Sequence, residues 1–332
     1  MASNLFSDCL FPPQQQSKEL SEMKQYFKKN GKIKDFQAHE SKAHSVDWNS
    51  DGRKVASGST DKTVSVFSLD RYGLTRLHNY KGHSDHVDQL CWHPSHPEYL
   101  VSASEDKTIR IWDARIGHKC AQCINTKGDN INICWSPDGN TIAVGNKEDL
   151  ITWIDTRNYK TKSEMHFNFE VNEISWNNAN DYFFLTNGHG CIVILSFPEL
   201  KVMDTLQAHS SNCISLEFDP QGRYFATGSA DALASLWDLD ELVCVRSFPR
   251  LVWPVRTLSF SFDGKMLAMG SEDHHMDIAL VETGEEVFKV PCNASTFCVA
   301  WHPNKYLLAF VSDDKDRHER DAGAVRLFGI PE

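Results

Sequence analysis

A short pattern of apolar and polar residues returns seven times along this chain of 332 residues. In each copy an aromatic residue follows an aliphatic residue two positions earlier, which is the period of a strand with one buried face. Successive aromatic residues lie 41 to 44 positions apart, which is the period of an array of repeats. These aromatic anchors are Trp48, Trp92, Trp135, Trp176, Phe218, Phe260 and Trp301.

The clearest copy runs over residues 81–113, KGHSDHVDQLCWHPSHPEYLVSASEDKTIRIWD. It opens with Gly82-His83, closes with Trp112-Asp113, and places turn residues between its apolar runs. A Gly-His to Trp-Asp frame of this length is typical of the WD40 repeat. Seven anchors therefore predict an all-β fold, a seven-bladed WD40 β-propeller.

Both ends of the chain indicate a closed ring. The third strand of the seventh copy is AVRLFG (324–329), and the chain ends soon afterwards, so this copy lacks a fourth strand. Residues 32–37 (KIKDFQ) precede an Ala-His pair in the same way as residues 201–207 (KVMDTLQ) do. We therefore expect the N-terminal segment to supply the missing strand, so that both termini pair in one sheet and hide its edges.

Two segments fall outside the repeat. Residues 1–30 are expected to form a flexible extension, with a disordered PPQQQ run (12–16) and room for one short helix in KELSEMKQYFKKN (18–30). The propeller is predicted over residues 31–332. In the seventh copy about eight extra residues separate the second and third strands, within the charged run from Asp313 to Gly323.

Histidine and aspartate recur at matched positions in the first, second and fifth copies. Each histidine lies nine residues before the anchor, and each aspartate lies six before the end of the third strand. A catalytic pair would not recur in three separate copies, so we interpret these residues as hydrogen-bond networks within single blades. The predicted network residues are His39, Asp61, His83, Asp106, Trp112, His209, Asp231 and Trp237.

Composition narrows the range of functions. Hydrophobic residues make up 41% of the chain and charged residues 24%, as in ordinary globular proteins. There is no apolar run long enough for a membrane span and no secretory signal, so we expect an intracellular protein whose ten cysteines are reduced. The net charge of -11 argues against a broad phosphate-binding surface.

Motifs for catalysis and metal binding are weak. The sequence holds no glycine-rich phosphate loop, nucleophile elbow or HExxH motif, so we expect a protein that is not an enzyme and has no cofactor. Cys120 and Cys123 form a CxxC pair, but no second pair follows at a spacing that completes a zinc site. The pair also falls in a predicted strand, whereas a redox CxxC motif needs a helix start.

Residues suited to protein docking gather in the last two blades. The loops from fourth to first strands and from second to third strands emerge on one rim of a propeller. Tryptophan and arginine, which are enriched at interface hot spots, lie there beside the charged insertion. The predicted docking rim comprises Arg250, Trp253, Arg256, His274, His275, Asp314, Arg317 and Arg320. The alternatives are that Trp253 packs across the mouth of the channel and that the insertion is a solvated loop.

Several segments extend the likeness beyond generic WD40 repeats. NTKGDNINICWSPDGNTIAVGNK (125–147), FEVNEISWNN (169–178) and WPVRTLSFSFDGKMLA (253–268) resemble the THO complex subunit 3 family, and the resemblance covers about residues 33–331. It implies a nuclear, non-enzymatic scaffold in the assembly that couples transcription to mRNA packaging and export. It also implies binding to the large THO subunit, a helicase and an RNA-binding export adaptor nearby, indirect or weak RNA contact, and no membrane.

One alternative function matches part of the sequence, and a second lacks the site that it would need. Trp112-Asp113-Ala114-Arg115 fits the WDxR pattern of substrate receptors for cullin–RING ubiquitin ligases, although Trp-Asp belongs to the repeat itself. A reader of histone peptides would need an acidic, aromatic-lined pocket on the rim, and Asp88 alone does not form one.

Overall fold

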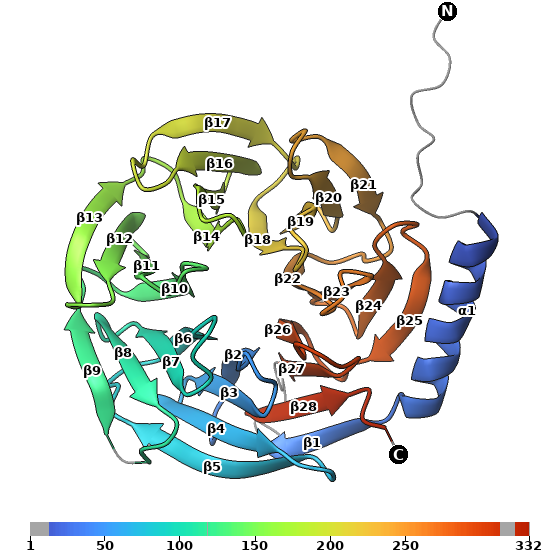
Figure 1. Ribbon diagram of the computed structural model, residues 1–332, viewed down its shortest axis with the longest axis horizontal. Coiled ribbons are helices and arrows are strands. Elements are labelled where there is room, and N and C mark those ends of the chain that lie inside the picture. The colour runs from blue at the N-terminus through green and yellow to red at the C-terminus, as the bar shows by residue number, and fades with distance from the viewer. Residues whose placement is uncertain (1–12, 118, 313–322, 332) are drawn as a thin grey trace, which may run out of the picture.

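The computed structural model describes residues 13–117, 119–312 and 323–331. Seven four-stranded antiparallel sheets stand around a central axis like the blades of a propeller (Figure 1). In each blade the first strand lies nearest the centre and the fourth forms the outer edge. The predicted seven-bladed, all-β WD40 fold is therefore confirmed.

Blades 1 to 4 each use four consecutive strands. Blade 1 contains β2 (Ala43–Trp48), β3 (Lys54–Ser59), β4 (Thr63–Leu69) and β5 (Leu74–Lys81). Blade 2 contains β6 (Val87–Trp92), β7 (Tyr99–Ser104), β8 (Thr108–Asp113) and β9 (Cys120–Asn125). Blade 3 contains β10 (Asn130–Trp135), β11 (Thr141–Asn146), β12 (Leu150–Asp155) and β13 (Lys160–His166). Blade 4 contains β14 (Val171–Trp176), β15 (Tyr182–Asn187), β16 (Cys191–Ser196) and β17 (Val202–Gln207).

Blades 5 and 6 continue the order, and blade 7 departs from it. Blade 5 contains β18 (Cys213–Phe218), β19 (Tyr224–Ser229), β20 (Ala234–Asp238) and β21 (Cys244–Phe248). Blade 6 contains β22 (Val255–Phe260), β23 (Met266–Ser271), β24 (His275–Leu280) and β25 (Glu286–Pro291). Blade 7 contains β26 (Thr296–Trp301), β27 (Leu308–Ser312), β28 (Ala324–Phe328) and, from the other end of the chain, β1 (Ile33–Gln37).

The aromatic anchors join each blade to the one before it. Trp48 is buried, and its indole Nε1 donates to the carbonyl oxygen of Ala300 in blade 7 at 3.2 Å. In the same way, Trp92 Nε1 donates to the carbonyl oxygen of Asp47 in blade 1 at 3.0 Å. At these two anchors the tryptophan buries a large apolar ring and also satisfies its polar atom.

Blade 7 closes the ring with strands from both ends of the chain. β1 pairs antiparallel with β28, with Ile33 opposite Phe328 and Gln37 opposite Ala324. The closure predicted from the incomplete seventh copy is therefore confirmed. Because β1 covers the outer edge of β28, no break is left in the ring between the first and last blades.

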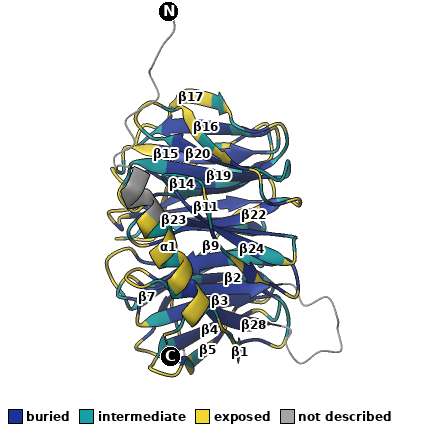
Figure 2. Ribbon diagram, turned by 90° about the vertical axis from the view of Figure 1, so that its right-hand side faces the viewer, coloured by how far each residue is buried: buried dark blue, intermediate teal, exposed yellow. Residues whose placement is uncertain are grey.

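One helix, α1 (Pro13–Asn30), lies along the side of blades 6 and 7 (Figures 1 and 2). Phe27 has no exposed surface, and its ring stacks on Phe328 with 5.4 Å between centroids, beside Phe288 of β25. This packing differs from the flexible extension expected for residues 1–30, because burying the phenylalanine favours a docked helix. The helix also begins within the run expected to be disordered. Residues 1–12 lie outside the described residues, and the domain boundary at residue 30 stays a prediction.

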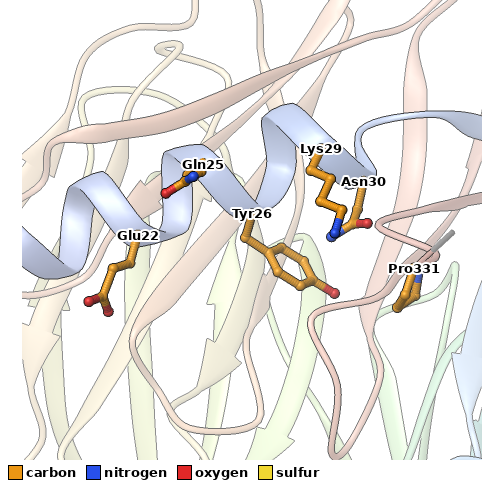
Figure 3. Close-up of a pocket in the computed structure, with 6 residues that line it drawn as sticks. All are labelled: Glu22, Gln25, Tyr26, Lys29, Asn30 and Pro331. Carbon is orange, nitrogen blue, oxygen red and sulfur yellow. The ribbon is translucent and has the colours of Figure 1, made fainter.

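Contacts near both ends attach α1 to the propeller. The Lys265 ammonium lies 2.5 Å from the Glu19 carboxylate, and the Tyr26 hydroxyl donates toward the Gly329 carbonyl oxygen at 3.3 Å. Where the helix meets the C-terminal segment, it leaves an open cavity of about 490 Å³ (Figure 3). Its lining residues are Glu22, Gln25, Tyr26, Lys29, Asn30 and Pro331. No helix in the described part of the chain is long and apolar enough to cross a membrane.

Candidate protein-docking site

Three blades carry a histidine–aspartate network that ties the incoming loop to the blade. In blade 2, His83 Nε2 lies 2.8 Å from Ser102 Oγ and His83 Nδ1 lies 2.9 Å from Asp106 Oδ2. Trp112 Nε1 donates to the same Ser102 hydroxyl at 2.9 Å, which links the loop to the third strand. Blades 1 and 5 repeat these contacts through His39, Ser57 and Asp61, and through His209, Thr227, Asp231 and Trp237.

The surroundings of these aspartates keep them ionised. Burial acts to raise the pKa of Asp106, but hydrogen bonds from His83, Thr108 and the Ser84 N–H outweigh it and hold the pKa well below its usual range. Burial lowers the pKa of His209, against the opposing effect of its aspartate. A histidine fixed between a hydroxyl and a carboxylate, repeated in three blades, is a structural arrangement.

Blade 6 holds its incoming loop in a different way. At the positions of the histidine and the hydroxyl residue it has Leu251 and Met269, which are buried in one apolar cluster. The preceding residue, Arg250, donates from Nε to Oδ2 of Asp277 in β24 at 2.7 Å. Asp277 has no exposed surface, so the arginine compensates a buried charge. The predicted docking residue Arg250 therefore anchors the loop rather than offering a free guanidinium group.

Next to Arg250, the rim exposes two apolar side chains. Val252 is 74% exposed and Trp253 is 54% exposed, and both lie in the loop between β21 and β22. Trp253 is also absent from the residues that line the central channel, so the structure gives no support to its packing across the channel mouth. These two adjacent exposed apolar side chains form the apolar part of the candidate docking surface.

Arg256, His274 and His275 complete the described part of the predicted rim. Arg256 is exposed, and its Nε donates to Glu272 Oε1 at 3.0 Å, a surface pair that a partner could replace at small cost. His274 is exposed, whereas His275 Nδ1 lies 3.5 Å from Asp273 Oδ1. The remaining predicted rim residues, Asp314, Arg317 and Arg320, lie outside the described residues.

The arginine of the WDxR sequence is paired within the repeat. Arg115 Nε donates to Oδ1 of the buried Asp113 at 2.9 Å. Blade 3 has the same arrangement, in which Arg157 Nε donates to Asp155 Oδ1 at 3.0 Å. Two successive blades thus use one Asp-x-Arg pair to brace the turn after the third strand. The structure of the repeat accounts for the pair, and it gives no specific support for a ligase receptor.

In the part of the chain that the structure describes, the cysteines and acidic residues do not form a well-defined metal site. Cys120 and Cys123 lie in β9 and belong to no candidate ligand cluster there. The cluster that was found among those residues is Asp85, His86 and Glu105, on the rim of blade 2. Lys147 lies 2.6 Å from Glu105, so a lysine already compensates one of these carboxylates.

The repeat pattern did not indicate an acid-lined central channel. The channel is a cavity of about 540 Å³ lined by the first strands of all seven blades, and it holds Asp47, Glu173 and Glu217. Burial raises the pKa of Asp47 and of Glu173 to about 7. Burial also raises the pKa of Glu217 to about 8, with further repulsion from the other two carboxylates. The sequence does carry a signal for these acids. Each lies one or three positions before an aromatic anchor, on the opposite face of the strand from the buried aliphatic residue.

Sequence similarity to known proteins extends along most of the chain. Residues 39–311 match the family described as the THOC3 beta-propeller domain. THO complex subunit 3 of Arabidopsis thaliana is 48% identical over 300 residues, which make up 90% of this chain and 95% of that protein. WD repeat-containing protein AAC3 of Dictyostelium discoideum is 32% identical over 338 residues, with 94% of this chain and 70% of that protein covered. The similarity therefore spans the ring from blade 1 into blade 7, and not a single repeat.

Proposed function

Because this chain belongs to the THO complex subunit 3 family of WD40 proteins, we propose that it is a nuclear, non-enzymatic scaffold subunit of the THO complex. It docks protein partners during the assembly of mRNA–protein particles on transcribing genes and during mRNA export. The observation that carries this proposal is the 48% identity to a protein named as a THO subunit, across 95% of that protein's length.

The chemistry of the propeller is consistent with a scaffold. Its recurring polar residues are held by hydrogen bonds that fix loops to blades, as in the His83 and Asp106 pair. Its large THO partner is expected to bind the rim of blade 6 through Val252 and Trp253, with the helicase and the export adaptor nearby. Contact with RNA is indirect or weak, because a chain with a net charge of -11 repels phosphate.

Affinity purification of the tagged full-length chain from nuclease-treated nuclear extract tests the proposal. We expect the THO subunits in stoichiometric amounts, because protein contacts survive the removal of RNA. Recovery of a cullin–RING ligase adaptor in their place would support the alternative function. A chain that is excluded from the nucleus, or that recovers neither set of partners, would contradict the scaffold role.

The docking surface is tested by the double variant Val252→Ser/Trp253→Ala. We expect recovery of THO subunits to fall by about tenfold or more, as is usual when an interface hot spot is removed. The free energy of unfolding should not change, because both side chains are exposed. Tyr72→Ala is the matched control, since Tyr72 is 78% exposed in the turn between β4 and β5. Equal recovery with the double variant and the control would remove blade 6 as the docking surface.

A further inference from the structure

The central channel concentrates negative charge. Four carboxylates line it, those of Asp47, Asp88, Glu173 and Glu217, whereas Arg256 is the one arginine or lysine among the described residues of its lining. Arg256 is itself paired with Glu272, which is not part of that lining. The channel therefore contains more carboxyl groups than its own cationic residues can compensate.

The hydrogen bonds within the ring use only part of the acceptor capacity of these carboxylates. Asp47 accepts a bond from the Trp92 N–H at 2.9 Å, and Glu173 accepts one from the Ile174 N–H at 3.1 Å besides longer contacts of 3.3 and 3.4 Å from the Gln89 amide. Glu217 accepts no hydrogen bond from any described residue. At the mouth, Asp88 Oδ2 is fully buried and has no partner among the described residues. Buried carboxylates in this state favour a cationic partner.

The spacing of the carboxylates favours an extended organic cation over a metal ion. Among the described residues, three ligand atoms within 4.8 Å of one another are found in the Asp85, His86 and Glu105 group, and not in the channel. A lysine or arginine side chain is long enough to pass several carboxylates in turn, and it carries a charge that each of them can share.

The channel mouth also lies close to the candidate docking surface. Trp253 is three residues before Arg256, which lines the mouth at the start of β22. A segment bound against Val252 and Trp253 therefore passes beside the opening. Charge complementarity then determines which of its side chains enters.

We propose that the channel accepts a lysine or arginine side chain of the protein that docks on blade 6, with Asp47, Glu173 and Glu217 as its counter-charges. This inference rests on the proposed function for the identity of the partner. The binding chemistry of the channel does not depend on that identity, so the two are tested separately.

The first test uses a small probe and no partner. N-acetyl-arginine amide is titrated into the full-length protein carrying ¹³C-labelled carboxyl groups, and N-acetyl-citrulline amide serves as the neutral control. We expect the arginine probe to shift the carboxyl resonances of Glu173 and Glu217 and to lower their pKa values, because a bound cation stabilises the ionised form. Equal shifts with both probes, or shifts confined to surface carboxylates, would overturn the proposal.

The second test measures affinity for a purified THO subassembly. The channel variant Asp47→Asn/Glu173→Gln/Glu217→Gln is compared with Asp204→Asn/Asp240→Asn/Glu241→Gln, which removes the same charge from exposed positions on blades 4 and 5. We expect the channel variant to bind about tenfold more weakly and the surface variant to bind as wild type does. Unchanged affinity of the channel variant, or equal loss in both, would overturn the proposal. If the wild-type chain itself fails to bind THO, the proposed function is wrong. The probe titration then still shows whether the channel binds a cationic side chain.

Discussion

Arg250 and Asp277 are joined by a hydrogen bond of 2.7 Å between the loop entering blade 6 and the third strand of that blade. The pair does for blade 6 what the His83 and Asp106 pair does for blade 2, since both tie an incoming loop to the blade body. It also holds the backbone beside Val252 and Trp253, so the candidate docking surface is presented from a fixed loop. Stability and docking are thereby linked at one position.

Arg250→Ala is expected to lower the free energy of unfolding by about 2–3 kcal/mol, because it leaves the buried Asp277 carboxylate without its partner. Burial already raises the pKa of Asp277, against the lowering effect of Arg250. Chemical denaturation checks the change. Arg256→Ala is the control, because its ion pair with Glu272 is exposed and contributes less than about 0.5 kcal/mol. Equal losses in the two variants would show that Arg250 has no special structural role.

Asp106→Ala is expected to destabilise the protein by about 2–3 kcal/mol at pH 7, because it removes the acceptor that holds His83 and Thr108. The folded-state pKa of Asp106 is depressed, so its contribution is present above the unfolded pKa of about 3.9 and is lost as pH falls through the lower folded value. The gap between variant and wild type should therefore shrink below about pH 4. Thermal unfolding that is unchanged at pH 7 would refute the network assignment.

Glu217→Gln is expected to stabilise the free protein at alkaline pH. Because the folded-state pKa of Glu217 is raised to about 8, wild-type stability is greatest below the unfolded value and declines as pH rises through about 8. The amide removes that decline. We expect the free energy of unfolding to rise by about 1–2 kcal/mol at pH 9 and to stay the same near pH 4. The gain at pH 9 is smaller than the full pKa shift implies, because solvent in the channel screens the charge. Denaturation at both values checks the sign, and a loss at pH 9 would contradict an uncompensated carboxylate.

Phe27→Ala is expected to cost about 3–4 kcal/mol, because it empties a site in which the ring has no exposed surface. Hydrogen exchange should then increase along α1 and at the seam between β25 and β28. Lys24→Ala is the control, since this lysine lies on the exposed side of the same helix. A small effect of Phe27→Ala would indicate that the helix is a removable extension.

The sequence was sufficient for the ring because the fold repeats a local signal. An aromatic anchor and an aliphatic residue two positions earlier mark each first strand, and the incomplete seventh copy marks the closure by β1. Each signal comes from residues close together in the chain. Seven repetitions therefore reinforce one interpretation.

The contacts that the sequence did not reveal join distant residues once each. Phe27 packs on Phe328, about 300 positions away, and no periodicity marks either residue as a partner. Arg250 could be taken for a docking residue because blade 6 has lost the histidine signature, and its partner Asp277 lies in a different strand. The channel acids are a different case. Their positions next to the aromatic anchors can be seen in the sequence, but only the closed ring shows that they share one channel.

The most direct test of the docking account is site-specific photo-crosslinking in the native complex. A photoreactive phenylalanine analogue is introduced in place of Trp253 and, separately, in place of Tyr72, a reference position that is more exposed still. The account predicts that position 253 crosslinks to a THO subunit and that position 72 does so far less. Crosslinks to THO subunits from position 72 with none from position 253 would contradict docking on blade 6.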